Sequence, residues 1–126
     1  MIDSVSTSTA PPPAGTYSQG IRCAGLVFLS GQGPFNEKGE RVGATFEEQV
    51  RRTFENLEAV AQAAGSSLAY AVRYGVYLRN LDDFTEFNAI AADYLTAPLP
   101  ARTTIEAALR GFDIEIDAIV AVPDAA

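Results

Sequence analysis

Short apolar runs separated by turn residues occupy the first third of the chain, a pattern that is typical of β-strands. Residues 18–22 and 26–30 are predicted to form two strands, and the unbroken apolar centre of the second indicates burial on both faces. The polar segment NEKGER, residues 36–41, has the composition of a loop tip. Residues 1–14 are rich in Ser, Thr and Pro and show no periodicity. We therefore expect a flexible N-terminal arm, followed by a single domain of residues 15–126.

The spacing of the apolar residues changes to that of a helix after residue 44. Thr45 and Glu48 stand three residues apart and match a capping box, in which each side chain accepts a hydrogen bond from the backbone near the other residue. Gly65 is a typical helix end. Between these signals the apolar residues lie on one stripe, which comprises Phe46, Val50, Phe54, Leu57, Val60 and Ala64.

The second half of the chain is predicted to hold a strand, a second helix and two final strands. Asn80 is placed to cap the second helix, which Pro98 and Pro100 end. The final strands are expected at residues 101–108 and 113–122. The apolar side of the second helix comprises Phe84, Phe87, Ala91 and Tyr94. The strand at residues 71–80 alternates, with Val72, Tyr74, Val76 and Leu78 on one face and Arg73, Gly75, Tyr77 and Arg79 on the other.

The order of these elements, β-β-α-β-α-β-β, predicts an α+β fold in which two helices cover one face of a mixed sheet. The opposite face would carry a mixture of side chains, such as Arg73, Gly75, Tyr77, Glu115, Asp117 and Ile119. This mixture is neither a dry core nor a fully polar surface, and it is typical of a face that packs against another copy of the chain. We therefore expect a homo-oligomer.

The charge of the chain limits its partners. Nine basic and sixteen acidic residues give a net charge of −7, which disfavours binding to nucleic acid or to an anionic membrane. No apolar run approaches the length of a membrane span, and the N-terminus lacks the pattern of a signal peptide. Cys23 is the only cysteine, so no intramolecular disulfide can form and a cytoplasmic setting is expected.

The absence of histidine removes several kinds of chemistry. Without it, a Ser-His or Cys-His nucleophile pair cannot form within the chain, and the commonest nitrogen ligand of zinc, copper or iron is missing. Lys38 is the only lysine and lies in the predicted loop tip at residues 36–41, which makes a Schiff-base mechanism a poor candidate. Catalysis would therefore depend on carboxylates, tyrosine, arginine, backbone amides and water.

Arg102 and Glu115 stand inside the two final strands, whose other residues are mostly apolar. If Ile105 and Ile114 mark the helix-covered core, alternation sends Arg102, Thr104 and Glu115 together to the opposite face. One interpretation is a salt bridge between Arg102 and Glu115 on the sheet surface, worth about 0–1 kcal/mol.

The alternative interpretation is a binding site for a small organic acid. The guanidinium of Arg102 offers a planar fork of donors that matches a carboxylate. Glu115, partly buried or close to Asp117, is expected to have a raised pKa and to exchange a proton with water or substrate.

Three further residues are candidates for the same site, although each also has an ordinary structural explanation. Tyr17, in a turn flanked by glycines, is either a site hydroxyl or an aromatic residue that closes the core. Gly31, in the segment SGQGP, could let the backbone approach a ligand or could simply form a bulge. Asn88 is either a ligand contact or a solvated residue of the second helix.

Taken together, these segments resemble the RidA (YjgF) family of reactive-imine deaminases. The resemblance extends from about residue 10 to residue 122, through GTYSQGI, FLSGQGP, EEQVRRTFENLEAVAQAAGSSL, YGVYLRNLDDFTEFNAI, LPARTTIE and IEIDAI, which occur in the order and spacing of the family. It implies a chorismate-mutase-like fold that assembles as a homotrimer, with three sites in the clefts between subunits. It also implies that no metal or organic cofactor is required.

The resemblance assigns roles to the candidate residues. Arg102 would grip the carboxylate of a 2-imino or 2-enamino acid, and Glu115 would position the water that attacks the imine carbon. The products would be ammonia and a 2-oxo acid. Tyr17 matches the site tyrosine of the family, and the substrate-binding residues would be Arg102, Gly31, Asn88 and Thr104, the last through its main-chain amide.

Other functions remain open from the sequence. One is a pathway-specific deaminase that acts on an aminoacrylate-like or aminomuconate-like enamine. A second is a non-catalytic trimer that binds a small carboxylate and regulates or protects a partner. A chorismate-mutase-type isomerase ranks last, because its dianionic transition state would need several cations and only Arg102 is a clear candidate.

Overall fold

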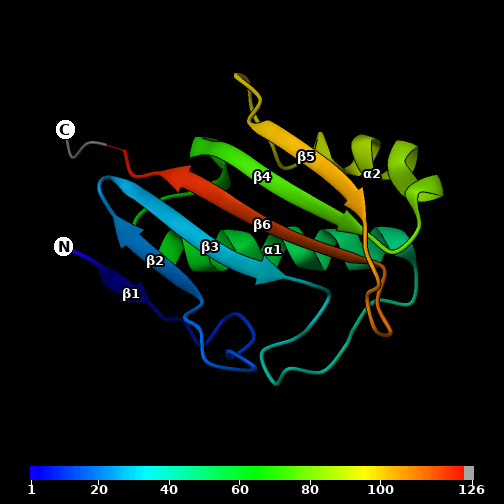
Figure 1. Cartoon of the computed structure of the whole chain (residues 1–126), viewed down its shortest axis with the longest axis horizontal. Coiled ribbons are helices and arrows are strands. Elements are labelled where there is room, and N and C mark those ends of the chain that lie inside the picture. The colour runs from blue at the N-terminus through cyan, green and yellow to red at the C-terminus, as the bar shows by residue number, and fades with distance from the viewer. Residues whose placement is uncertain (124–126) are drawn as a thin grey trace.

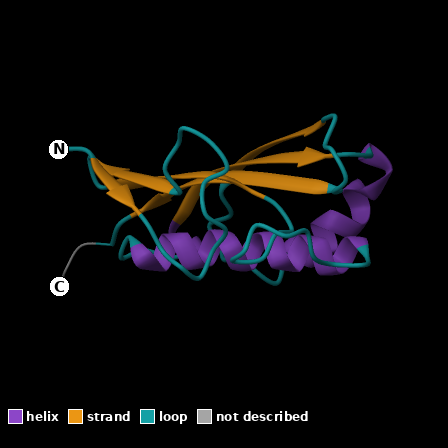
Figure 2. Ribbon diagram, turned by 90° about the horizontal axis from the view of Figure 1, so that it is seen from below, coloured by secondary structure: helices purple, strands orange, loops and turns teal. Residues whose placement is uncertain are grey.

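The protein consists of a six-stranded mixed sheet with helices on one face (Figures 1 and 2). The computed structural model describes residues 1–123. The strands are β1 (Asp3–Val5), β2 (Gly20–Cys23), β3 (Leu26–Gln32), β4 (Ala71–Leu78), β5 (Ala101–Glu106) and β6 (Ile114–Ala121). The helices are α1 (Phe46–Ala63) and α2 (Phe84–Ala91), with short 3-10 turns η1 (Leu68–Tyr70) and η2 (Leu81–Asp83). The sheet order is β1-β2-β3-β6-β4-β5, in which only β4 and β5 pair in parallel. The predicted α+β arrangement is confirmed.

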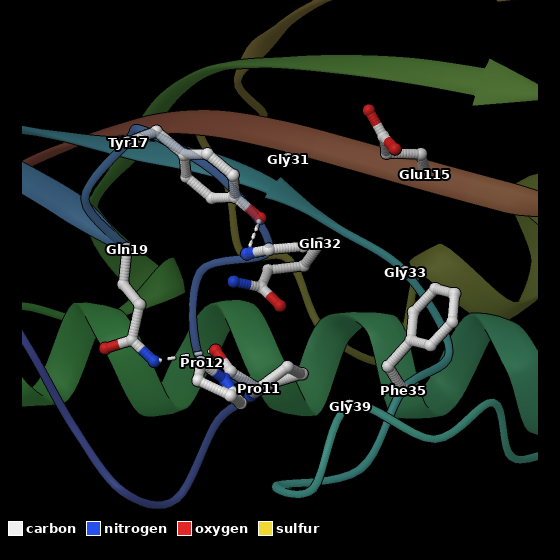
Figure 3. Close-up of a pocket in the computed structure, with 11 residues that line it drawn as sticks. Pro11, Pro12, Tyr17, Gln19, Gly31, Gln32, Gly33, Phe35, Gly39 and Glu115 are labelled. Carbon is white, nitrogen blue, oxygen red and sulfur yellow. Dashed lines mark hydrogen bonds between the residues drawn. The ribbon is translucent and has the colours of Figure 1, made fainter.

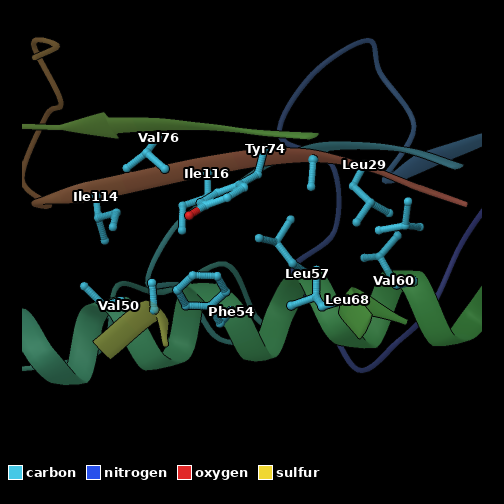
Figure 4. Packing of buried hydrophobic residues seen from close by; sticks show 14 of the residues in the cluster. Leu29, Val50, Phe54, Leu57, Val60, Leu68, Tyr74, Val76, Ile114 and Ile116 are labelled. Carbon is cyan, nitrogen blue, oxygen red and sulfur yellow. The ribbon is translucent and has the colours of Figure 1, made fainter. Parts of the chain in front are cut away.

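The main core lies between α1 and the sheet (Figure 4). Val50, Phe54 and Leu57 on α1 are buried against the sheet side chains Ile114 and Ile116 of β6. Complete burial of one such side chain stabilises the fold by about 1.5–3 kcal/mol. The apolar stripe predicted from the sequence therefore anchors α1 on the sheet and leaves the opposite sheet face without helices.

The predicted helix signals are confirmed, although the second helix is shorter than expected. Thr45 Oγ1 accepts a hydrogen bond from the amide of Glu48 at 3.2 Å, and Gly65 follows the helix at φ +81°. The side chain of Asn80 accepts from the amide of Asp82 at 2.9 Å, which begins η2 ahead of α2. None of the helices in residues 1–123 has an apolar stretch long enough to cross a bilayer.

Residues 1–14, which we expected to form a flexible arm, include a strand, because Asp3–Val5 forms β1 and pairs with β2. The reason is a buried side chain outside the arm. Gln19 is 3 % exposed, accepts from the amide of Thr7 at 2.6 Å and donates to the carbonyl of Pro11 at 2.8 Å. These bonds, and the burial of Val5, hold the segment against the sheet.

The predicted orientation of the first of the two final strands is also wrong. In the parallel register of β5 with β4, Thr104 lies opposite Val76, which is fully buried under the helices. Arg102 and Thr104 therefore lie on the helix-covered side, and Ile105, which is 46 % exposed, lies on the uncovered face. The alternation of side chains along a strand correctly predicts which residues share a face. Which of the two faces is buried depends on the strand with which it pairs.

Asn56 links α1 to the loop that follows β3, and its loss should measurably destabilise the fold. Its buried Nδ2 donates to the carbonyls of Gly33 at 3.0 Å and Phe35 at 2.8 Å. Asn56→Ala is expected to lower the free energy of unfolding by about 2 kcal/mol, because it removes two hydrogen bonds that a buried amide makes to the loop. Urea denaturation at one fixed protein concentration measures the change, with Gln62→Ala on the exposed side of α1 as the control. An equal effect of the two substitutions would contradict this role.

Candidate functional site

One group of predicted site residues lies around a pocket at the end of β3. The pocket has a volume of about 190 Å³, and Figure 3 shows Tyr17, Gly31 and Glu115 around it. We call these three residues the glutamate half-site. The remaining lining residues come mainly from the N-terminal segment and the loop after β3: Pro11, Pro12, Ala14, Gln19, Gln32, Gly33, Phe35 and Gly39.

Tyr17 forms a wall of this pocket and does not close the core. Its side chain is 51 % exposed, and its hydroxyl oxygen accepts a hydrogen bond from the amide of Ala14 at 2.9 Å. Because that bond uses only the oxygen, the hydroxyl proton stays available for a ligand. The loop that carries Tyr17 is tied to the sheet next to Gly31, since Ser30 Oγ donates to the carbonyl of Ser18 at 2.6 Å.

Glu115 lies on the uncovered face of the sheet, directly across from Gly31. A Cβ at position 31 would stand 2.7 Å from Glu115 Oε2, so a larger residue there would force the Glu115 side chain to move. Burial raises the pKa of Glu115, and the nearby negative charge of Asp117 raises it further. The expected upward shift is therefore confirmed, and Glu115 is suited to carry a proton at a higher pH than an ordinary glutamate.

A second group of predicted residues gathers on the other side of the sheet. Arg102 Nη1 donates to Asn88 Oδ1 at 2.6 Å, and the guanidinium carbon lies 5.2 Å from the ring centroid of Phe84. We call Asn88, Arg102 and Phe84 the arginine half-site. Asn88 binds one edge of the Arg102 guanidinium, and the Phe84 ring lies against the flat face of that group. The other N–H donors of Arg102 therefore stay free to bind an anion. The salt-bridge interpretation is wrong within the described chain, because no ion pair joins Arg102 to Glu115.

An apolar groove of about 420 Å³ begins at the arginine half-site. Its polar groups, Asn88 and Arg102, belong to that half-site, and the rest of its lining consists of Tyr74, Ala91, Ala92, Leu95, Leu99 and Pro100. A ligand whose acid group reached Arg102 could extend an apolar side chain along this groove.

Thr104 lies two residues beyond Arg102 on the same side of β5. Its Oγ1 is buried and has no hydrogen-bond partner within residues 1–123. The hydroxyl therefore does not serve the fold of the single chain, and Thr104 remains a candidate for ligand contact.

The two half-sites do not meet within one chain. Glu115 pairs with Tyr77 and shares the uncovered face, whereas Arg102 pairs with the buried Tyr74 and shares the helix-covered side. The two pockets have no lining residue in common. The predicted placement of Arg102, Thr104 and Glu115 on one face is therefore wrong, and one site containing all of them would need more than one chain.

Sequence reasoning did not find every residue of the two half-sites. Phe84 was predicted only as part of the apolar side of the second helix, and Leu95, which follows that helix, gave no signal. Leu99 lies between two prolines and gave no signal apart from its exposure, which is 71 % in the structure. The contact of a ring with a guanidinium depends on the angle at which α2 crosses β5, and periodicity carries no information on that angle.

Comparison with known proteins identifies the class to which this arrangement belongs. A family model described as endoribonuclease L-PSP matches residues 7–122. The chain is 34% identical to RidA of the Antarctic bacterium Psychrobacter, and the two structures superpose with a TM-score of 0.89, covering 95% of this chain and 99% of that one. The chain therefore belongs to the RidA (YjgF) family, which that family model describes.

Two further similarities concern ligands. The chain is 32% identical over 121 residues to a protein of the mite Dermatophagoides farinae named 2-iminobutanoate/2-iminopropanoate deaminase, and the match covers 94% of each chain. It is 28% identical to TdcF of E. coli, whose crystal structure contains bound serine. That match has a TM-score of 0.87 and covers 94% of this chain and 98% of TdcF.

Proposed function

We propose that the protein hydrolyses 2-imino and 2-enamino acids to 2-oxo acids and ammonia. The observation that carries the proposal is the pair of half-sites, one suited to hold a carboxylate and the other to move a proton, in a chain of the RidA family. The deaminase name of the mite relative and the serine bound to TdcF support a small amino-acid-like ligand. We also propose a cytoplasmic setting, because the single Cys23 fits a reducing compartment.

The reaction is proposed to begin with the carboxylate of the substrate on the fork of Arg102. Two parallel N–H···O bonds would fix both the position and the rotation of the acid. The Glu115 carboxylate lies beside Gly31, where we propose that it holds the attacking water molecule. Orientation of this kind supplies much of the catalysis that an already reactive imine needs.

The chemical step needs only one proton-transfer group. The water oxygen bonds to the imine carbon while a water proton passes to Glu115, and the π electrons of the C=N bond move to nitrogen. Glu115 then returns the proton to nitrogen, which gives a carbinolamine. In a second transfer Glu115 takes the hydroxyl proton and passes it to the nitrogen, the O–H electrons form the carbonyl of the 2-oxo acid, the C–N bond breaks and ammonia leaves. The raised pKa of Glu115 supports both directions of transfer.

The complete site is proposed to form in a homotrimer, at the contact between neighbouring copies. Apolar side chains on the uncovered sheet face support such a contact, since Phe28 and Ile105 are 43 % and 46 % exposed. If each copy offers its arginine half-site to the glutamate half-site of the next, the contacts close into a ring.

An in situ imine assay tests the proposal. An amino-acid oxidase generates imines from a panel of amino acids, and 2-oxo acid formation is followed with and without the protein, in competition with a carbonyl trap. Acceleration above the spontaneous rate supports the deaminase. If no imine on the panel is accelerated, the deaminase proposal fails for 2-imino acids, and retained affinity for small carboxylates would then favour the binding-only alternative.

The apolar groove predicts the order of substrates within that panel. Imines from leucine, methionine and phenylalanine should be hydrolysed with a kcat/KM about 10-fold or more above those from glutamate or lysine, because apolar side chains gain from burial in the groove. Leu99→Ser should reduce this preference. Leu81→Ser makes the same substitution at an exposed leucine outside the groove and should leave the preference unchanged. The same ranking in both variants would contradict the role of the groove.

A further inference from the structure

Two carboxylates of β6 point to the uncovered face, and each lies over a glycine of a neighbouring strand. Glu115 lies over Gly31 of β3. Asp117, two residues further along, lies over Gly75 of β4, where a Cβ would stand 2.5 Å from Asp117 Oδ1. A glycine in the interior of a strand weakens the strand and often marks a close approach, which here is that of a carboxylate.

Asp117 is held by both of its oxygens. The amide of Gly75 donates to Oδ1 at 3.1 Å, and the hydroxyl of Tyr77 donates to Oδ2 at 3.2 Å. Asp117 forms no ion pair with any residue in the described part of the chain. The nearby Arg73 instead donates to Thr103 Oγ1 at 3.4 Å. The negative charge of Asp117 is thus fixed in position, and no salt bridge within residues 1–123 neutralises it.

The fixed charge acts on the neighbours of Asp117. Asp117 is the largest cause of the raised pKa of Tyr77, and after burial it is the cause of the raised pKa of Glu115. Since residues two apart in a strand are separated by about 7 Å on one face, this influence needs no direct contact.

Few other titratable or charged groups face Glu115. Tyr77 faces it from β4, with Arg73 further along the same strand, and Tyr17 faces it across the pocket. Gly31 of β3 contributes no side chain. Asp117 is therefore the negative charge best placed to influence the proton on Glu115.

We propose that Asp117 is a positioning residue of the reaction. Its negative charge, which two hydrogen bonds hold in place, helps Glu115 to keep the proton that Glu115 takes from the attacking water. The inference rests on the proposed deaminase function, and Asp117 itself exchanges no proton. The Gly75 amide and the Tyr77 hydroxyl serve to hold the charge at a fixed distance from Glu115.

The Asp117→Asn variant tests this role, because it removes the charge and keeps an oxygen for the Gly75 amide. The pKa of Glu115 should fall toward that of an ordinary glutamate, so the acidic limb of the kcat/KM profile should move to lower pH. At neutral pH, kcat should fall by about 2- to 10-fold, because a weaker base assists the water less. KM should change little, since Arg102 holds the acid. Glu55→Gln, which removes one exposed charge from α1, is the matched control and should leave the limb in place.

A direct titration separates this inference from the proposed function. Carbon-13 NMR of labelled glutamate carboxyls, with the Glu115 signal assigned by its absence in Glu115→Gln, reports its proton affinity without any activity. A Glu115 titration that moves to lower pH in Asp117→Asn supports the role, and an unchanged one overturns it. If Asp117→Asn does not fold, Tyr77→Phe decides, since it releases one oxygen of Asp117 and should move the titration in the same direction. If the wild-type protein is inactive, the deaminase proposal fails, and the proposed role of Asp117 in catalysis fails with it.

Discussion

Arg102→Ala is expected to lower kcat/KM for 2-imino acids by about 100-fold or more. A guanidinium that binds a carboxylate through two charge-assisted hydrogen bonds contributes about 3 kcal/mol or more, and each 1.4 kcal/mol corresponds to a factor of ten. In the structure, Asn88 and the Phe84 ring hold the guanidinium for this task. The loss should therefore appear in KM as well as in kcat, because both the grip and the orientation of the substrate disappear.

Two control variants make the result specific. Arg102→Lys keeps the positive charge but loses the planar fork, and it should fall between the wild type and Arg102→Ala. Arg110→Ala removes an exposed arginine in the loop before β6 and should leave the rate unchanged. Full hydrolysis by Arg102→Ala would falsify the proposed grip on the substrate carboxylate.

Glu115→Gln is expected to lower kcat by about 100-fold or more while KM changes little. Loss of a positioned acid-base group costs about 10²- to 10⁴-fold in rate, and glutamine cannot exchange the proton. The amide is nearly isosteric with the carboxylate that lies over Gly31, so the local packing should persist. Steady-state kinetics at saturating substrate measure the effect. Equal binding of a 2-oxo acid by both forms would show that the variant remains intact.

A mixture of the two defective chains distinguishes a shared site from a site within one chain. In a ring of three, the mixed trimers of Arg102→Ala and Glu115→Gln chains contain about one complete site in three, because one chain supplies the arginine and its neighbour the glutamate. Co-expression with two different tags isolates these trimers, and they should regain about one third of the wild-type rate. If the mixed trimers are as inactive as the single variants, the site does not lie between copies.

The periodicity of the sequence predicts most of the helices and strands, and the structure shows why some features escape it. Helix α1 follows from a long apolar stripe, because burial of one face alone decides its structure. Strand β1 has three residues, too few to show a period, and depends on the buried side chain of Gln19 outside it. Strand β5 carries mixed side chains on both faces, so its orientation depends on its register with β4.

The candidate residues of the site were easier to find than their arrangement. Arg102 and Glu115 stand out because charged side chains are uncommon in strands that are mostly apolar, and burial does raise the pKa of Glu115, as predicted. Their separation onto opposite sides of the sheet depends on tertiary pairing, which a single sequence does not display. Gly75 offered a further signal, since a glycine in the middle of a strand marks a close approach, here that of Asp117.

The position of each carboxylate over a glycine also restricts how such sequences can diverge. Because a Cβ at Gly75 would meet Asp117 Oδ1 at 2.5 Å, a larger residue can enter there only if the Asp117 side chain moves or is replaced. The same steric relation holds between position 31 and Glu115. In a descendant of this chain, an alanine or serine at either glycine would therefore be accompanied by an acid opposite it that has moved or been replaced.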